Sequence, residues 1–264
     1  MTPECDGMPA IVTLLTDFGT LDGFVGAMKG VILTRAPDAL VVDLTHDVPP
    51  QDVWAGAWAL REACGMFPEG SIHVAVVDPG VGTARRPILV EHRGHLFVGP
   101  DNGLLSLVAP GGIARHLDRE DLFRADISHT FHGRDIFASV AGHLAAGVAP
   151  ADCGSPVEEW LGLELPTPIL VADGVQGCVL HVDRFGNLVS NINADEVVGR
   201  SGWVDVDGGP ARVPLYTTFA DVAPGQWVAY RGSSGFLEIA VRDGDAAGTL
   251  DGVSRNRRVT LCRG

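Results

Sequence analysis

Two kinds of apolar run alternate along the first 165 residues of the chain. Short runs at 10–15, 39–44 and 71–77 suit buried strands, and residues 22–36 and 52–67 between them carry apolar side chains at helical spacing. Strands that are apolar on both faces and separated by helices are typical of a parallel sheet covered on both sides. The alternation therefore predicts an N-terminal α/β domain, residues 8–165, with a mostly parallel sheet.

The pattern changes after Pro166 and Pro168, which indicate a linker. Beyond them, short strand-like runs lie between turns rich in Gly and Asp, at the spacing of a small barrel or sandwich. We expect a C-terminal all-β barrel domain over residues 170–264. In the first domain, the strand-like run at 95–99 should pair with its neighbour at 87–92, and residues 135–147 should form a helix that ends at a glycine.

The charge of the chain limits the partners it can have. Its formal net charge is −14, whereas nucleic acids and anionic membranes select basic surfaces, so we expect neither as a partner. No apolar stretch approaches the roughly 20 residues of a membrane span, and residues 1–12 lack the pattern of a secretory signal. Five scattered cysteines favour reduced thiols and a cytoplasmic protein: Cys5, Cys64, Cys153, Cys178 and Cys262.

Three acidic residues lie at the carboxyl ends of predicted strands: Asp17, Asp43 and Asp78. In open parallel sheets, ligands bind at the carboxyl ends of the strands. A carboxylate there can accept hydrogen bonds from the vicinal hydroxyls of a ribose. Each Asp alone is also a common helix N-cap or turn residue, but three in equivalent places favour a binding site.

The segment VVDPGVGTARR, residues 76–86, carries Asp78 into a glycine-containing loop and on to Arg85. A phosphate site is a weak interpretation, because the loop has neither GKS/GKT nor GxGxxG and leads into a strand instead of a helix. A metal site, an oriented water or a salt-bridged turn all remain open from the residues alone.

Other candidates lie in two polar clusters of the first domain. His46 and Asp47 have no evident third ligand for a metal, so their proline-rich segment is better read as a rigid turn or a wall of the site. His132 precedes a glycine, which would let its ring face open space. Asp135 is a candidate N-cap for the following helix, and Arg134 a candidate structural ion-pair partner.

The C-terminal domain offers two further candidates. In HVDRFGNLVSNI, Phe185 presents a ring face and Asn187 has the donors and acceptors needed to read a heterocycle edge, although an ordinary hairpin is the alternative. In RGSSGFLEIAV, the hydroxyls of Ser233 and Ser234 could hold a carboxylate.

Eight segments in order resemble the S-adenosylmethionine hydroxide adenosyltransferases, relatives of the fluorinase and chlorinase enzymes, over residues 10–262. The resemblance implies an N-terminal α/β domain, a C-terminal β-barrel and a homotrimer that binds its substrate between domains of adjacent subunits. It implies hydrolysis of S-adenosyl-L-methionine to adenosine and L-methionine. The segments are LLTDFG, MKGVI, DLTHDVPPQD, VVDPGVGTARR, VGPDNGLL, TFHGRDIF, VDRFGNL and GSSGFLEIAV.

The resemblance also implies residue roles. The water-handling residues of the family fall on Asp78, Arg85 and His132, and either Asp78 or His132 could be the base. No metal and no redox cofactor is implied. The substrate contacts fall on Asp17 for the ribose hydroxyls, Asp183 for the amino group, Phe185 and Asn187 for adenine, and Ser233 for the methionine carboxylate.

Departures from the halogenases bear on the choice of nucleophile. This chain has Gln51 where those enzymes carry a ribose-facing tryptophan, and Gly133 where fluorinases carry a halide-binding serine. Ser234 stands where halogenases can carry an arginine. Asp78, which fluorinases lack, favours water over halide because a carboxylate repels an anion. The alternatives are a 5′-halo-5′-deoxyadenosine synthase and a non-catalytic adenosine or S-adenosylmethionine-binding protein.

Overall fold

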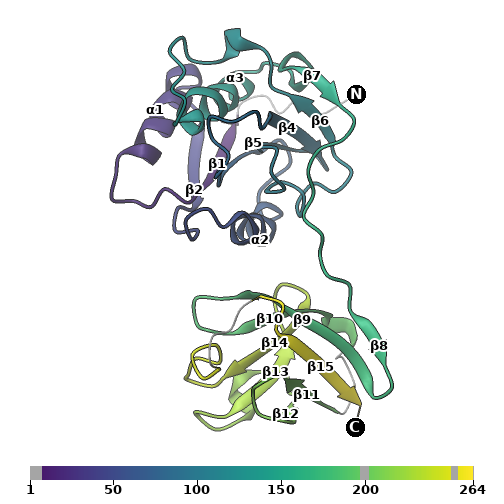
Figure 1. Cartoon of the computed structure of the whole chain (residues 1–264). Helices are drawn as coiled ribbons and strands as arrows, with labels where there is room; N and C mark the ends of the chain where they lie inside the picture. Colours follow the sequence, from purple (N-terminus) through teal and green to yellow (C-terminus); the bar gives the residue numbers. More distant parts are fainter. Residues whose placement is uncertain (1–7, 197–201, 251–254, 264) are drawn as a thin grey trace. The chain divides into compact units, whose positions relative to one another are not determined.

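The structure is a computed structural model that describes residues 8–196, 202–250 and 255–263, so Cys5 lies outside the described residues. The chain divides into two compact units, residues 1–163 and 164–264 (Figure 1). Each unit is built around its own sheet.

The first unit contains a seven-stranded sheet in the order β2-β1-β3-β5-β4-β6-β7. Its central strands are almost fully buried, as the two-sided apolar runs predict. The strands are β1 (Ile11–Thr16), β2 (Leu40–Thr45), β3 (Ile72–Val76), β4 (Pro87–His92), β5 (His95–Pro100), β6 (Ile113–His116) and β7 (Ser155–Val157).

The sheet is mixed, and the expectation of a mostly parallel sheet is wrong. The pairs β1–β2, β1–β3 and β3–β5 are parallel. The pairs β4–β5, β4–β6 and β6–β7 are antiparallel. The cause is local: β4 and β5 are joined by Arg93 and Gly94, whose φ angles of 46° and 76° form a tight hairpin turn. The predicted pairing of residues 95–99 with 87–92 is confirmed.

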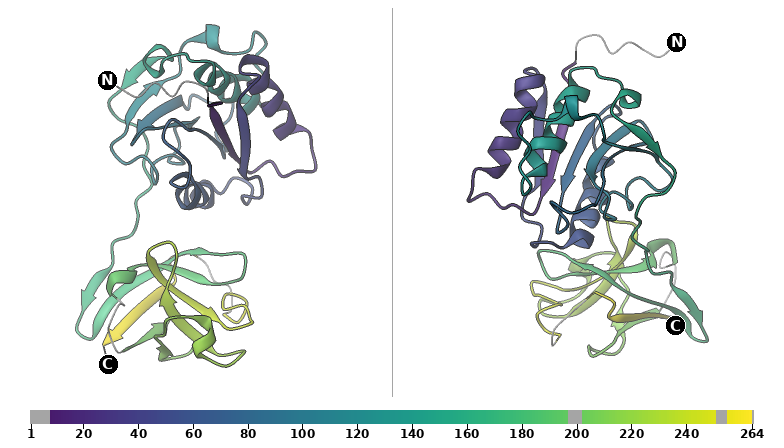
Figure 2. Two further views of the ribbon diagram at one scale, coloured as in Figure 1. Left: turned by 180° about the vertical axis from the view of Figure 1, so that it is seen from behind. Right: turned by 45° about the horizontal axis from the view of Figure 1, so that its top comes forward.

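Helices cover both faces of this sheet (Figure 2). On one face, Met28 and Ile32 of α1 (Phe24–Arg35) share a core with Phe137 and with residues of α3 (Ser139–Ala145). On the other face, Ala57 and Leu60 of α2 (Val53–Cys64) pack on the opposite side of the strands. The remaining elements are η1 (Glu120–Leu122), the π-helix η2 (Gly133–Ala138) and η3 (Pro150–Asp152).

The second unit is an antiparallel sheet that curls into a nearly closed barrel. The sheet runs β12-β11-β15-β9-β10-β14-β13, with β8 paired to β9, and its end strands lie beside each other through the Leu215–Ala229 bridge. The elements are β8 (Ile169–Val171), β9 (Gly174–Val182), β10 (Leu188–Asn193), η4 (Ala194–Glu196), β11 (Gly202–Val206), β12 (Val213–Pro214), η5 (Phe219–Asp221), β13 (Trp227–Arg231), β14 (Phe236–Val241) and β15 (Arg258–Arg263).

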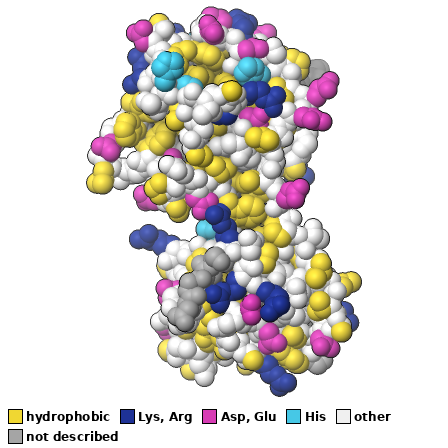
Figure 3. All heavy atoms as spheres, in the orientation of Figure 1, with side chains coloured by type: hydrophobic (Ala, Val, Ile, Leu, Met, Phe, Trp, Pro, Cys, Tyr) yellow, Lys and Arg dark blue, Asp and Glu magenta, His cyan; other side chains and the backbone are white. Residues whose placement is uncertain are grey.

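The acidic side chains and the cysteines of the described residues can be located in the structure. On the face drawn in Figure 3, acidic side chains are scattered over both units. Among the described residues, none of the helices combines the length and the apolar character that crossing a bilayer requires. Cys64, Cys153 and Cys262 are buried and Cys178 is half-buried, and all four are unbridged thiols.

Candidate active site

The candidate site of the first unit begins at the carboxyl ends of two adjacent parallel strands. Thr16, the last residue of β1, pairs in register with Val76 of β3. Asp17 and Asp78 therefore leave the sheet at the same edge, where the sequence predicts that such carboxylates gather.

The loop after β3 reverses the chain so that Arg85 returns over Asp78. Its backbone makes two successive turns, with Val81 N donating to Asp78 O and Thr83 N donating to Gly80 O. Gly82 has a φ of +77°, and a Cβ there would lie 2.7 Å from the carbonyl oxygen of His129. The glycine thus permits close packing of this loop against the segment that leads to His132, which is a structural need and not a phosphate cradle.

Asp78, Arg85 and His132 lie in one hydrogen-bonded cluster. Arg85 Nε lies 3.0 Å from each carboxylate oxygen of Asp78, and its Nη2 hydrogen-bonds to both Asp78 and His132. The Arg85 Nη2 to His132 Nδ1 distance is 2.8 Å. The side chains of Arg85 and Asp78 are only 9% and 5% exposed, so this ion pair is largely shielded from water.

The protonation of His132 follows from this contact. A guanidinium has donors and no acceptor, so Nδ1 of His132 must accept, and the neutral ring carries its proton on Nε2. Burial lowers the pKa of His132, and the Arg85 charge lowers it further against the opposing effect of Asp78. The neutral ring is therefore the favoured form, and it presents an N–H donor at Nε2.

The helix after His132 starts differently from the sequence expectation. His132 itself is the N-cap of the π-helix η2, and the expectation that Asp135 caps the helix is wrong. Asp135 is fully buried and pairs with Arg134 and Arg124, while it accepts a hydrogen bond from Ser128 N. The prediction of Arg134 as a structural ion-pair partner is confirmed. A buried carboxylate satisfied in this way fixes the segment that carries His132.

Asp17 is held by a second network. Its Oδ2 accepts a hydrogen bond of 2.8 Å from the backbone N–H of Gln51, a residue with a φ of +65°. The Gln51 segment is in turn connected to the end of β1, because Gly19 N donates to the carbonyl oxygen of His46.

A chain of polar contacts extends from β1 to helix α1. Thr16 Oγ1 lies 2.8 Å from Nδ1 of His46, and Nε2 of His46 lies 3.0 Å from Asp43. Lys29 Nζ completes the chain at 2.6 Å from Asp43. Burial would raise the pKa of Asp43, but the Lys29 and His46 contacts lower it overall. Asp43 thus joins a structural network instead of the Asp78 cluster.

The metal alternative gains no support. Within the described part of the chain, His, Cys, Asp and Glu side chains form no group of three or more suited to hold a metal ion. His46 is buried against Thr16.

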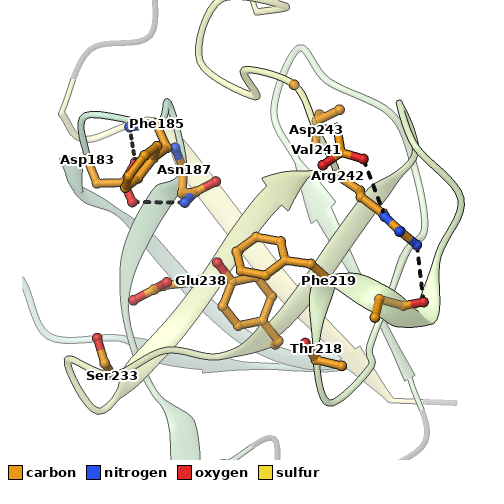
Figure 4. A pocket seen from close by; sticks show the side chains of 13 residues that line it. Asp183, Phe185, Asn187, Thr218, Phe219, Ser233, Glu238, Val241, Arg242 and Asp243 are labelled. Carbon is orange, nitrogen blue, oxygen red and sulfur yellow. Dashed lines mark hydrogen bonds and ion pairs between the residues drawn. The ribbon is translucent and has the colours of Figure 1, made fainter.

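Four candidate residues of the second unit, Asp183, Phe185, Asn187 and Ser233, line one hollow of about 900 Å³ (Figure 4). Asp183 organises the turn there: its Oδ1 accepts from the backbone N–H groups of Phe185 and Asn187, and its Oδ2 accepts from Asn187 Nδ2. Asn187 is buried, whereas the Phe185 ring is 76% exposed. Ser233 lies across the hollow from this turn (Figure 4).

The sequence interpretation missed several residues of the same hollow. Phe219 packs on Tyr230 with ring centroids 4.7 Å apart. Glu238 can be recognised in the sequence, because it is the single charged residue in the otherwise apolar strand FLEIAV. The lining residues that the sequence analysis did not single out include Thr218, Phe219, Tyr230, Glu238 and Arg242.

Family models match both units. The model described as the SAM hydroxide adenosyltransferase N-terminal domain matches residues 12–154, and the corresponding C-terminal domain model matches residues 177–259. The chain therefore belongs to the SAM hydroxide adenosyltransferase family.

Curated relatives extend over almost the whole chain. A protein of Salinispora tropica named (R)-S-adenosyl-L-methionine hydrolase is 44% identical, over 96% of this chain and 98% of the relative. A protein of the same name from Thermus thermophilus is 43% identical, over 90% and 94%. A fluorinase of Nocardia brasiliensis is 29% identical, over 89% and 91%.

A solved structure has the same fold. An uncharacterized conserved protein from Thermotoga maritima superposes with a TM-score of 0.89 at 35% identity, over 96% of this chain and 100% of that one.

Proposed function

We propose that this protein hydrolyses S-adenosyl-L-methionine to adenosine and L-methionine by attack of water at C5′. The observation that carries the proposal is the Asp78–Arg85–His132 cluster, at the strand edge where such a fold binds ligands. Relatives more than 40% identical over most of their length are named (R)-S-adenosyl-L-methionine hydrolase, which supports the same reaction here.

The proposed reaction depends more on positioning the attacking water than on acid catalysis. The sulfonium leaves as a neutral thioether, so the leaving group needs no proton. Attack needs a water held in line with the C5′–S bond, and such positioning can supply about 7–11 kcal/mol in favourable systems. The proposed chemistry therefore requires no metal ion and no redox cofactor, and turnover should survive chelation.

The geometry favours Asp78 over His132 as the proton acceptor. Neutral His132 has Nδ1 occupied by Arg85 and a proton on Nε2, so it is placed to donate a hydrogen bond to the water oxygen. Asp78 still has acceptor lone pairs beside those that Arg85 uses. In the proposed step the water oxygen bonds to C5′, the C5′–S bond breaks, and one water proton passes to Asp78 and then to solvent.

The remaining predicted residues would bind the substrate. Asp17 would accept from the ribose hydroxyls, and Phe185 and Asn187 would contact adenine. Asp183 would face the amino group, and Ser233 would bind the methionine carboxylate. The family resemblance further supports a homotrimer whose sites join the first unit of one subunit to the second unit of the next. The unbridged thiols support a cytoplasmic location.

Isotope labelling tests the reaction. Purified protein is mixed with S-adenosyl-L-methionine in ¹⁸O-water, as the separated (R) and (S) sulfonium epimers because the relatives' names specify (R). We expect the label in the 5′-hydroxyl of adenosine. Unlabelled adenosine, or a 5′-halo product when chloride or fluoride is added, would contradict hydrolysis. Tight binding of substrate without turnover would instead indicate a non-catalytic binding protein.

A further inference from the structure

The hollow of the second unit lies on the outer face of the barrel sheet. Tyr230 of β13 and Glu238 of β14 are direct cross-strand partners. The alternate residues Leu237 and Ile239 belong to the barrel core, so Tyr230 and Glu238 project to the opposite face. Figure 4 shows the Glu238 carboxylate between the Asp183 turn and Ser233.

The neighbouring backbone leaves space for the Glu238 carboxylate. A Cβ at Gly232 would overlap its carboxylate oxygen, so this position suits a residue without a side chain. Ser234 Oγ lies 3.4 Å from Glu238 Oε1. The site is therefore shaped around this carboxylate, which enters a hollow lined by aromatic rings and by polar side chains that include Asp183, Arg242 and Asp243.

Tyr230 interacts with two of the carboxylates of the hollow, Glu238 by a hydrogen bond and Asp183 through its charge. It is only 7% exposed, and burial, followed by the charge and the hydrogen bond of Glu238 and the charge of Asp183, raises the pKa of its phenol well above the usual range. The phenol therefore stays protonated and donates to Glu238. Two carboxylates facing one protonated phenol make this part of the hollow negatively charged, which favours a cationic ligand group.

Asp183 can make about one further hydrogen bond to that ligand group, because three donors from its own turn use its two oxygens and a carboxylate has about four lone-pair sites in all. A second carboxylate beside it would give an ammonium with three N–H donors another acceptor. Building on the proposed function, we propose that Glu238 binds the α-ammonium group of the methionine moiety, with Tyr230 orienting the carboxylate and Asp183 contributing its charge.

The assignment explains how substrate and products could be distinguished. S-adenosyl-L-methionine carries a sulfonium, an ammonium and a carboxylate, so it is a net cation, whereas adenosine is uncharged and methionine is a zwitterion. The lining of the hollow includes three carboxylates, Asp183, Glu238 and Asp243, against one guanidinium, Arg242, so it attracts the cation more than either product. Glu238 would thus favour binding of the substrate over retention of the products.

A substitution that removes only the charge tests the assignment. Glu238→Gln should raise the KM for S-adenosyl-L-methionine by about tenfold to a hundredfold, the usual cost of losing a hydrogen bond to a charged group, and change kcat far less. With the sulfonium analogue that lacks the α-amino group, wild type and Glu238→Gln should have the same KM. The matched control is Asp195→Asn, which removes one exposed carboxylate of the same unit outside the hollow.

Gly232→Ala gives an independent variant, because it should displace the Glu238 carboxylate without changing the charge of the chain. Its KM should also rise for the substrate and not for the amino-free analogue. If KM rises equally for both compounds in both variants, Glu238 has a merely structural role and the proposal is overturned. Weaker inhibition by adenosine in Glu238→Gln would place the carboxylate at adenine instead. Absence of turnover in the wild type would refute the proposed function itself.

Discussion

Arg85 is the residue on which the candidate site depends most. One guanidinium contacts both Asp78 and His132, so it fixes the direction of the carboxylate and the tautomer of the imidazole together. Lysine has no planar fork with which to make both contacts at once. The two possible bases therefore differ in chemistry because of one neighbour, which sequence spacing alone does not reveal.

Asp78→Asn tests the proposed acceptor. The amide keeps the size of the carboxylate but cannot take a proton, so we expect kcat to fall at least about a hundredfold, within the usual range for general base catalysis, with little change in substrate affinity. Single-turnover kinetics and equilibrium binding separate the two quantities. Asp121→Asn, at an exposed ion pair of the same unit, is the control. A variant that keeps most of its turnover would remove Asp78 from the mechanism.

Individual residues differed in how far the sequence could predict them. Asp78 and Arg85 stand in a recognisable segment, and the structure brings them together with His132 as expected. Asp43 resembled them in its expected place at the end of a strand, but it lies within β2 and pairs with Lys29 of the preceding helix α1. Glu238 matters through cross-strand pairing with Tyr230, and that pairing is set by the register of the barrel.

At the scale of elements, hydrophobic periodicity predicted strands and helices better than it predicted strand direction. The crossovers through α1 and α2 make β1, β2 and β3 parallel, as helices between strands require. Reversal at β4 comes from the Arg93–Gly94 turn, a local signal that outweighed the general pattern. The π-helical start of η2 has no periodicity signature, because buried Asp135 and its arginine partners shape that turn.

The central strands should make the first unit sensitive to acid. His73 of β3 is fully buried between Thr13 of β1 and His95 of β5, at 2.8 Å and 3.1 Å. Burial, with a smaller effect of His95, lowers the pKa of His73 to about 4. The unfolded chain takes up this proton near its ordinary pKa of about 6.5. Stability should therefore be full above about pH 6.5 and decrease towards pH 4, by about 2 kcal/mol at pH 5 for this group.

Urea denaturation at pH 7 and pH 5 measures this effect. His73→Gln, which keeps polar atoms but cannot titrate, should lose about 2 kcal/mol less than the wild type between the two values, whatever its absolute stability. His129→Gln, at an exposed position, should keep the wild-type slope. Equal slopes for wild type and His73→Gln would contradict a neutral, buried His73.

At the scale of the whole molecule, the proposed trimer can be tested by mixing inactive subunits. Asp78→Asn disables the first unit and Glu238→Gln combined with Asn187→Ala disables the second. When sites join units of adjacent subunits, random co-assembly should restore about one quarter of the wild-type sites. Co-expressed, co-purified protein is assayed for adenosine release. If oligomers that contain both variants release no adenosine, each site is formed within a single subunit.

The division into two units was visible in the sequence, because composition and periodicity change where the prolines lie. The boundary of the contact-defined units falls between Leu163 and Glu164, close to that change. How residues from distant parts of the chain share one hollow was not visible, since it depends on barrel closure and on which face each strand presents.

The polar chain from Lys29 to Thr16 connects helix α1 to the residue that precedes Asp17. It passes from the Lys29 ammonium, which is 33% exposed, through Asp43 and His46 to Thr16. Acetylation of Lys29 would remove the charge that Asp43 faces, and any effect on Asp17 would have to pass through these contacts. Asp17 is thereby connected to a lysine of a neighbouring helix that it does not itself touch.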